Sequence, residues 1–78
     1  MGGSRTILKI ACDSDEAIVE FEPLGYVLPL TKNDAFTVEF PAGTPEDIEI
    51  TITPRGLSVW PEKGLVRVTN KAGDVLID

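Results

Sequence analysis

Turn signals recur roughly every eight to ten residues along the chain, and this spacing limits the possible folds more than any other feature. Each signal is a cluster of Gly, Pro, Asn or Asp, and the segments between clusters are short and rich in β-branched and aromatic residues. The clusters lie at 13–15, 23–25, 32–34, 41–43, 54–56, 61–64 and 71–73. Because a helix of ordinary length does not fit between them, the sequence predicts one all-β domain over residues 5–78. Residues 1–4 are expected to be a flexible N-terminus or a tag remnant.

Two segments alternate without exception between apolar and polar residues, namely 36–40 and 48–52. A period of two with β-branched and aromatic side chains is typical of a strand that buries one face. We therefore predict that these two strands form the centre of the core. The link between them, from Pro41 to Asp47, is expected to be the longest loop.

Weaker alternation predicts further strands at 6–11, 17–22, 26–30, 57–60, 66–69 and 75–77, which makes seven to eight in all. Pro29 has no N–H to donate, so the strand that contains it is expected at a sheet edge or at a bulge. The short connections predict that strands adjacent in sequence pair antiparallel. A small β-sandwich and a flattened β-barrel both fit this pattern.

The composition excludes several classes of partner. Thirteen acidic and seven basic residues give a net charge of −6, which argues against nucleic acid and against anionic membrane surfaces. No apolar run approaches the length of a membrane span. Cys12 is the single cysteine, and a chain of 78 residues without a disulfide is expected in a reducing cytoplasm. The start of the chain, residues 1–6, matches the short N-myristoylation pattern, which we interpret as a chance match.

The candidates for chemistry are few, since the chain has no histidine to act as a general base or to bind zinc. The carboxylates at 13–16 lack the glycine of a calcium loop and are expected to form a solvated turn. Cys12 precedes these acids, which disfavour a reactive thiolate. Glu20 and Glu22 form a carboxylate pair that is expected on an outward face. We therefore predict no catalytic, cofactor or metal site, and no enzyme.

Trp60 is the most informative candidate for partner binding. If its neighbour Val59 points to the core, Trp60 projects outward and can form an interface hot spot together with Arg55. The opposite register would bury Trp60 as a core side chain. Tyr26 poses the same question. The predicted partner-binding residues are Trp60, Arg55, Tyr26, Glu20 and Glu22.

Turn motifs give the chain a resemblance to small uncharacterised bacterial all-β proteins. The segment 22–30 contains Glu-Pro-Leu-Gly and Leu-Pro-Leu, and the segment 34–38 contains Phe-Thr-Val. The similar proteins have a Glu-Pro-x-Gly turn, a Leu-Pro-x-Gly-Asp-like loop and a Phe-x-Val strand. The segment 57–61 is similar too, whereas Asn33 stands where those proteins have glycine. The resemblance implies a bacterial cytosolic protein without an assigned activity, and it transfers no functional residue.

These observations favour a non-enzymatic module that binds another protein or a second copy of itself. One alternative is a small ligand-binding β-barrel, although strands of about five residues leave little room for a lumen. Another is an acidic inhibitor or immunity-type protein for a basic partner. That alternative depends on the segment between Ile10 and Thr31, which carries five acids and no Lys or Arg.

Overall fold

The computed structural model describes residues 5–41 and 47–78, and it confirms the all-β prediction. Eight short strands alternate with turns: β1 (Thr6–Ala11), β2 (Glu16–Phe21), β3 (Tyr26–Thr31), β4 (Ala35–Phe40), β5 (Ile48–Thr53), β6 (Gly56–Pro61), β7 (Arg67–Thr69) and β8 (Val75–Ile77). Among these residues, no helix has the length and apolar character needed to cross a bilayer. The tail at 1–4 and most of the loop after Pro41 lie outside the described residues.

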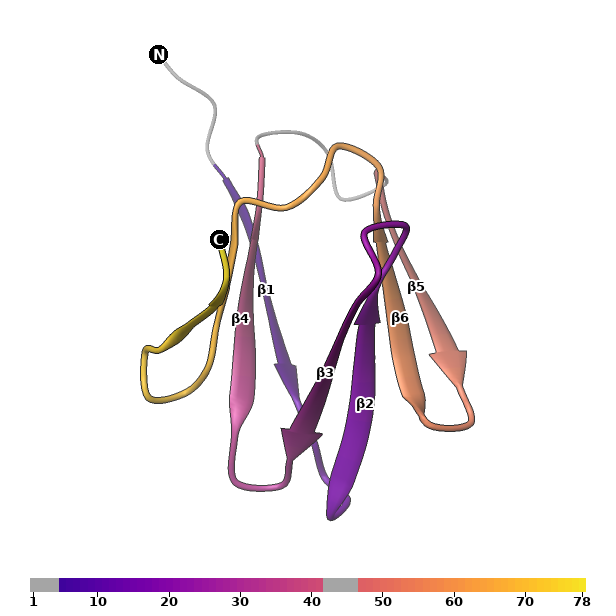
Figure 1. Cartoon of the computed structure of the whole chain (residues 1–78), viewed down its shortest axis with the longest axis vertical. Helices are drawn as coiled ribbons and strands as arrows, with labels where there is room; N and C mark the ends of the chain where they lie inside the picture. The colour runs from indigo at the N-terminus through magenta and orange to yellow at the C-terminus, as the bar shows by residue number, and fades with distance from the viewer. Residues whose placement is uncertain (1–4, 42–46) are drawn as a thin grey trace.

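The strands form two four-stranded sheets that pack into a sandwich (Figure 1). Sheet A has the strand order β1-β4-β7-β8, and sheet B has the order β3-β2-β6-β5. The core between them takes side chains from both sheets. Its fully buried members are Phe21, Phe36, Leu30, Val19, Val38, Val59 and Val68. The segment 36–40 therefore lies at the centre of the core, as its alternation predicted.

The expected pairing of sequence neighbours is correct for three hairpins and wrong elsewhere. The pairs β2–β3, β5–β6 and β7–β8 are antiparallel hairpins, but β1 pairs with β4, and β2 pairs with β6 in a parallel arrangement. The turns at 12–15 and 32–34 carry the chain from one sheet to the other. A short connection in a sandwich can therefore join strands that share no hydrogen bonds.

Gly56 makes the parallel contact between β2 and β6 possible. A Cβ atom at this position would lie 2.1 Å from the backbone oxygen of Ile18. The main chains are joined there by the Ile18 N–H, which donates to the Arg55 carbonyl oxygen at 2.8 Å. Further along, the Glu22 N–H donates to the Val59 carbonyl oxygen at 2.9 Å. Only a residue without a side chain permits this approach.

The prediction that the segment 48–52 lies at the centre of the core is wrong. Ile50 is 43% exposed and Ile52 is 79% exposed. The alternation itself is real, but β5 is an edge strand of sheet B and runs away from sheet A towards its C-terminal end (Figure 1). The apolar face of β5 therefore extends past the sheet that would cover it.

Pro29 lies on an edge strand, as predicted. β3 is the other edge of sheet B, and Pro29 is directly opposite Ile18 of β2. The Lys32 N–H donates to the Asp15 carbonyl oxygen in the same register, so alternate residues of β3 point their backbone groups at β2. By this alternation the nitrogen of Pro29 faces the open edge, where a missing donor costs nothing.

Asp34 joins two turns that are distant in sequence, and its removal should destabilise the fold. Its Oδ1 accepts hydrogen bonds from the Ala35 N–H and the Lys71 N–H, both at 2.8 Å. Hydrogen bonds to a charged acceptor contribute about 1.5–3 kcal/mol. We expect Asp34→Ala to lower the free energy of unfolding by about 2 kcal/mol, measured by urea denaturation. Asp13→Ala is the matched control in an exposed turn. An equal loss of unfolding free energy in both variants would show that the hydrogen bonds to Asp34 do not stabilise the fold.

Candidate functional site

Trp60 projects from the outer face of sheet B. Its neighbour Val59 is fully buried in the core, and successive side chains of a strand point to opposite faces. Trp60 keeps 43% of its surface exposed. Of the two registers open from the sequence, the structure has the outward one.

Two carboxylates flank Trp60 on the neighbouring strands. Glu49 of β5 is its direct partner across the antiparallel β5–β6 pair. On the other side, β2 runs parallel to β6 with Phe21 level with Val59, so the next residue, Glu22, lies level with Trp60. Residues opposite each other on one face have Cβ atoms about 5 Å apart. Trp60 therefore lies in a row between Glu22 and Glu49.

An open hollow of about 430 Å³ lies over this row. We call it the Trp60 surface, and its lining residues are Glu22, Pro23, Asp47, Glu49, Trp60, Pro61 and Glu62. Asp47 forms an ion pair with Lys63 at 3.2 Å. Within residues 5–41 and 47–78, no ion pair joins Glu22, Glu49 or Glu62 to a basic side chain. The surface thus presents an indole ring and unneutralised carboxylates.

The surroundings of the Trp60 surface strengthen its negative field. None of the four strands of sheet B contains Lys or Arg. The nearby basic residues lie in turns, and one of them, Lys63, is held by Asp47. Fields of neighbouring carboxylates add, and they attract cations over a distance of about one Debye length, ~8–10 Å in physiological salt.

The carboxylates of the Trp60 surface do not converge on a point. In the part of the chain that the structure describes, no group of three or more Cys, Asp or Glu side chains could hold a metal ion. Strand neighbours on one sheet face lie side by side and point in the same direction. This arrangement suits an extended or branched cation that contacts several carboxylates in turn and stacks on the ring.

The structure brings only part of the predicted binding set together. Glu20 lies on the same outer face, two residues before Glu22 in the chain, and it is level with Ser58 of β6. Arg55 is in the turn at the opposite end of the β5–β6 hairpin, about 13 Å or more from Trp60 along the strand. Tyr26 is 45% exposed at the start of β3. It lies opposite the buried Phe21, so it is on the inner face of sheet B, whereas Trp60 is on the outer face. The structure therefore does not place Arg55 beside Trp60.

Cys12 is occupied within its own turn. Its thiol donates to the Ser14 carbonyl oxygen at 3.3 Å and lies at the same distance from the Ser14 hydroxyl oxygen. The side chain is half-buried and packs against the core. These contacts give Cys12 a packing role in the turn that leads into β2.

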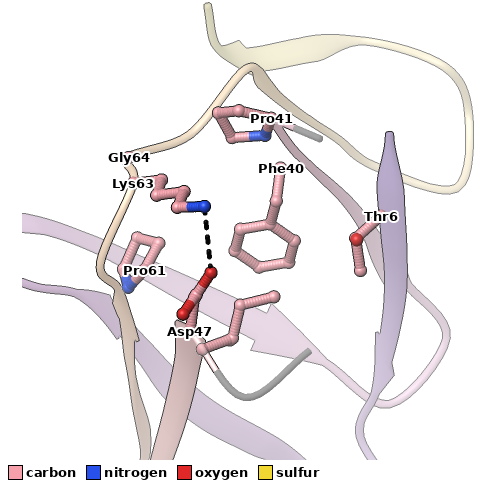
Figure 2. A pocket seen from close by; sticks show the side chains of 8 residues that line it. Thr6, Phe40, Pro41, Asp47, Pro61, Lys63 and Gly64 are labelled. Atoms are coloured by element: carbon pink, nitrogen blue, oxygen red, sulfur yellow. Dashed lines mark ion pairs between the residues drawn. The ribbon is translucent and has the colours of Figure 1, made fainter. Parts of the chain in front are cut away.

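A second hollow lies where the ends of both sheets meet, and Figure 2 shows it from close by. The Lys63 ammonium and the Asp47 carboxylate face each other at 3.2 Å beside the ring of Phe40. Its volume is about 10 Å³, which is near the minimum for one water molecule. This hollow is a packing detail at the end of the core, with no room for an organic ligand.

No protein-family model, curated protein or solved structure matches this chain.

Sequence reasoning missed Glu49 and Glu62 as members of the site. The alternation of β5 does place Glu49 on the outward face, so this part of the signal was present. Its position beside Trp60 follows from the β5–β6 register, and the position of Glu22 follows from the parallel β2–β6 pair. The antiparallel β5–β6 pair was expected from its short connection, whereas the parallel β2–β6 pair cannot be read from a local pattern.

Proposed function

We propose that this protein is a non-enzymatic interaction module, and that it binds a basic segment of another protein through the Trp60 surface. The observation that carries the proposal is an exposed tryptophan in a row between Glu22 and Glu49. Tryptophan is the residue most enriched at binding hot spots. It also attracts Lys and Arg through the face of its ring.

The charge of the chain supports a basic partner. The net charge is −6, and the strands of sheet B carry acids without bases. Complementary charge raises the rate of association and selects against acidic competitors. The Trp60 ring then contributes apolar contact area, which charge alone does not supply.

Binding without catalysis is supported by the residues that the chain lacks. It has no histidine, and its one thiol lies in a turn away from the Trp60 surface. General acid–base work needs groups held within hydrogen-bond reach of a substrate. Glu22 and Glu49, on either side of Trp60, instead point outward side by side.

The acidic-inhibitor alternative shares the basic partner but needs one continuous acidic face. Asp13 and Asp15 lie in the turn between β1 and β2, at the opposite end of β2 from Glu22. The acids of the segment from Ile10 to Thr31 are therefore spread along the length of the sandwich. This distribution favours recognition of a short basic segment over imitation of a nucleic acid.

Trp60 is the only tryptophan, so its fluorescence reports directly on the proposed site. We expect a short Arg- and Lys-rich peptide to change the Trp60 emission, with a dissociation constant on the order of 10–100 µM. The double variant Glu22→Gln/Glu49→Gln should weaken binding about tenfold or more, because two charge-assisted contacts are lost. Titration calorimetry and Trp60 fluorescence at low salt measure the dissociation constants of wild type and of the double variant.

The matched control is Asp13→Asn/Asp15→Asn, which removes the same charge far from Trp60. It should weaken the peptide by no more than about twofold, through the long-range field alone. Equal weakening by the two double variants, or emission that does not respond to the peptide, would contradict the site. In the native host, affinity capture with wild type and with Trp60→Ala should differ by the specific partner.

A further inference from the structure

We propose that two copies of this chain associate through β5, so that the two copies of sheet B join into one continuous eight-stranded sheet. This inference goes beyond the Trp60 surface and does not depend on it. Three features of the molecule support the dimer: the chemistry of the four sheet edges, the direction of the open backbone groups on β5, and the exposed isoleucines beside them.

Three of the four sheet edges carry a feature that blocks further pairing. β1 has Lys9 in its middle and β3 has Pro29, while β8 is only three residues long. Lysine, proline and shortness are the devices that keep sheet edges from pairing with another chain. β5 reads Ile-Glu-Ile-Thr-Ile-Thr over six residues, with neither Lys nor Pro. It is the one edge whose composition favours pairing.

The open backbone groups of β5 belong to its isoleucines. The Glu62 N–H donates to the Asp47 carbonyl oxygen at 2.9 Å, one step beyond the β5–β6 ladder and in the same register. Since hydrogen-bonded pairs alternate along an antiparallel ladder, every second residue of β5 from Glu49 onward points its N–H and C=O at β6. The same groups of the remaining residues point to the open edge: Ile48, Ile50 and Ile52.

This edge is complementary to itself under a two-fold axis. In an antiparallel pair centred on Ile50, Ile50 lies opposite Ile50 of the second copy, and Ile48 lies opposite Ile52. By symmetry, Ile52 also lies opposite Ile48 of the second copy. All three pairs are of the hydrogen-bonded type, and all these side chains lie on the inner face of the sheet. Glu49, the one charge of the strand, lies opposite Thr51 of the second copy. A two-fold interface requires such self-matching.

The side chains at this edge supply the apolar contact. Ile52 is 79% exposed and Ile50 is 43% exposed. Beside them, an open apolar hollow of about 340 Å³ lies between β5 and β1, and exposed Ile7 is part of its lining. One six-residue strand is about 20 Å long, so the interface falls at the small end, under ~1,200 Å² in total. We therefore infer a reversible dimer, with a dissociation constant on the order of 10–100 µM.

Sedimentation velocity on the full chain tests the proposal without any added ligand. From ~1 µM to ~500 µM, wild type should shift from monomer to dimer, with a midpoint in the range inferred above. Ile52→Lys should stay monomeric throughout, with a dissociation constant raised at least tenfold, because each copy then places a charge opposite the apolar Ile48 of the other. Circular dichroism checks that the variant remains folded, which we expect since Ile52 is largely exposed.

The matched control is Val27→Lys, since Val27 is 50% exposed on the other edge of sheet B. It should dimerise as wild type does. Dimerisation should also tighten as salt rises from ~20 mM to ~300 mM, because the two Glu49 side chains are diagonal neighbours across the pair. A wild type that is monomeric at every concentration would overturn the proposal. So would an Ile52→Lys variant that dimerises normally, or a dimer lost in Val27→Lys.

Discussion

Gly56→Ala is expected to unfold the protein. The new Cβ would lie 2.1 Å from the Ile18 oxygen, 2.7 Å from its nitrogen and 2.9 Å from its carbonyl carbon. All three are backbone atoms of β2, so no side chain can move aside to relieve the clash. Gly56 also has a φ of +156°, which L-residues rarely adopt. Relief requires the separation of β2 from β6, which are the two central strands of sheet B.

The expected cost of Gly56→Ala is about 4 kcal/mol or more, against a total stability of about 4–8 kcal/mol for a domain of this size. Thermal unfolding followed by circular dichroism measures it. Gly25→Ala is the matched control, because Gly25 has a φ of +84° and open space around it. It should cost only about 1 kcal/mol, from backbone strain alone. Similar stability in the two alanine variants would show that the backbones of β2 and β6 lie far enough apart at Gly56 to admit a Cβ atom.

Phe21→Ala should have an effect of similar size for a different reason. Phe21 is fully buried, and its backbone neighbours are Tyr26 of β3 and Val59 of β6. Removal of a buried phenylalanine ring costs about 3–5 kcal/mol, because apolar burial is lost and a cavity remains. We therefore expect the variant to fold with only a small part of the wild-type stability. Urea denaturation, with the slope compared to wild type, gives the loss in free energy.

The control for Phe21 is its cross-strand partner. Tyr26 is directly opposite Phe21 but is 45% exposed. Tyr26→Ala should cost only about 1 kcal/mol, since the surface that it loses is partly in water already. A loss as large as that of Phe21→Ala would mean that burial does not rank the side chains of this row.

Parts of the candidate site could be predicted, and parts could not. That Trp60 projects outward follows from the alternation of β6, once Val59 is assigned to the core. That Glu22 and Glu49 flank it depends on two strand pairings, one of them parallel between strands 35 or more residues apart. Arg55, five residues before Trp60 in the chain, lies at the other end of the β5–β6 hairpin. Nearness along the chain is a poor guide to nearness on a sheet, since each residue adds about 3.3 Å along a strand.

β5 shows most clearly what an alternating sequence pattern cannot predict. The alternation of its isoleucines correctly indicates a strand with one apolar face. A period of two, however, reports which side chains share a face and not whether anything covers that face. The position of β5 at an edge, where it diverges from sheet A, turned an expected core strand into exposed apolar surface.

The sequence by itself determined that the chain forms short strands, where most of them begin and end, and which side chains share a face. These properties are local, because backbone sterics and turn residues set them within a few positions. Only the tertiary structure decided that β1 pairs with β4 and β2 with β6, that β5 is an edge strand, and that Trp60 lies between two carboxylates. Those outcomes depend on contacts between distant segments, whose free energies are summed over both sheets and leave no signature in any single stretch of sequence.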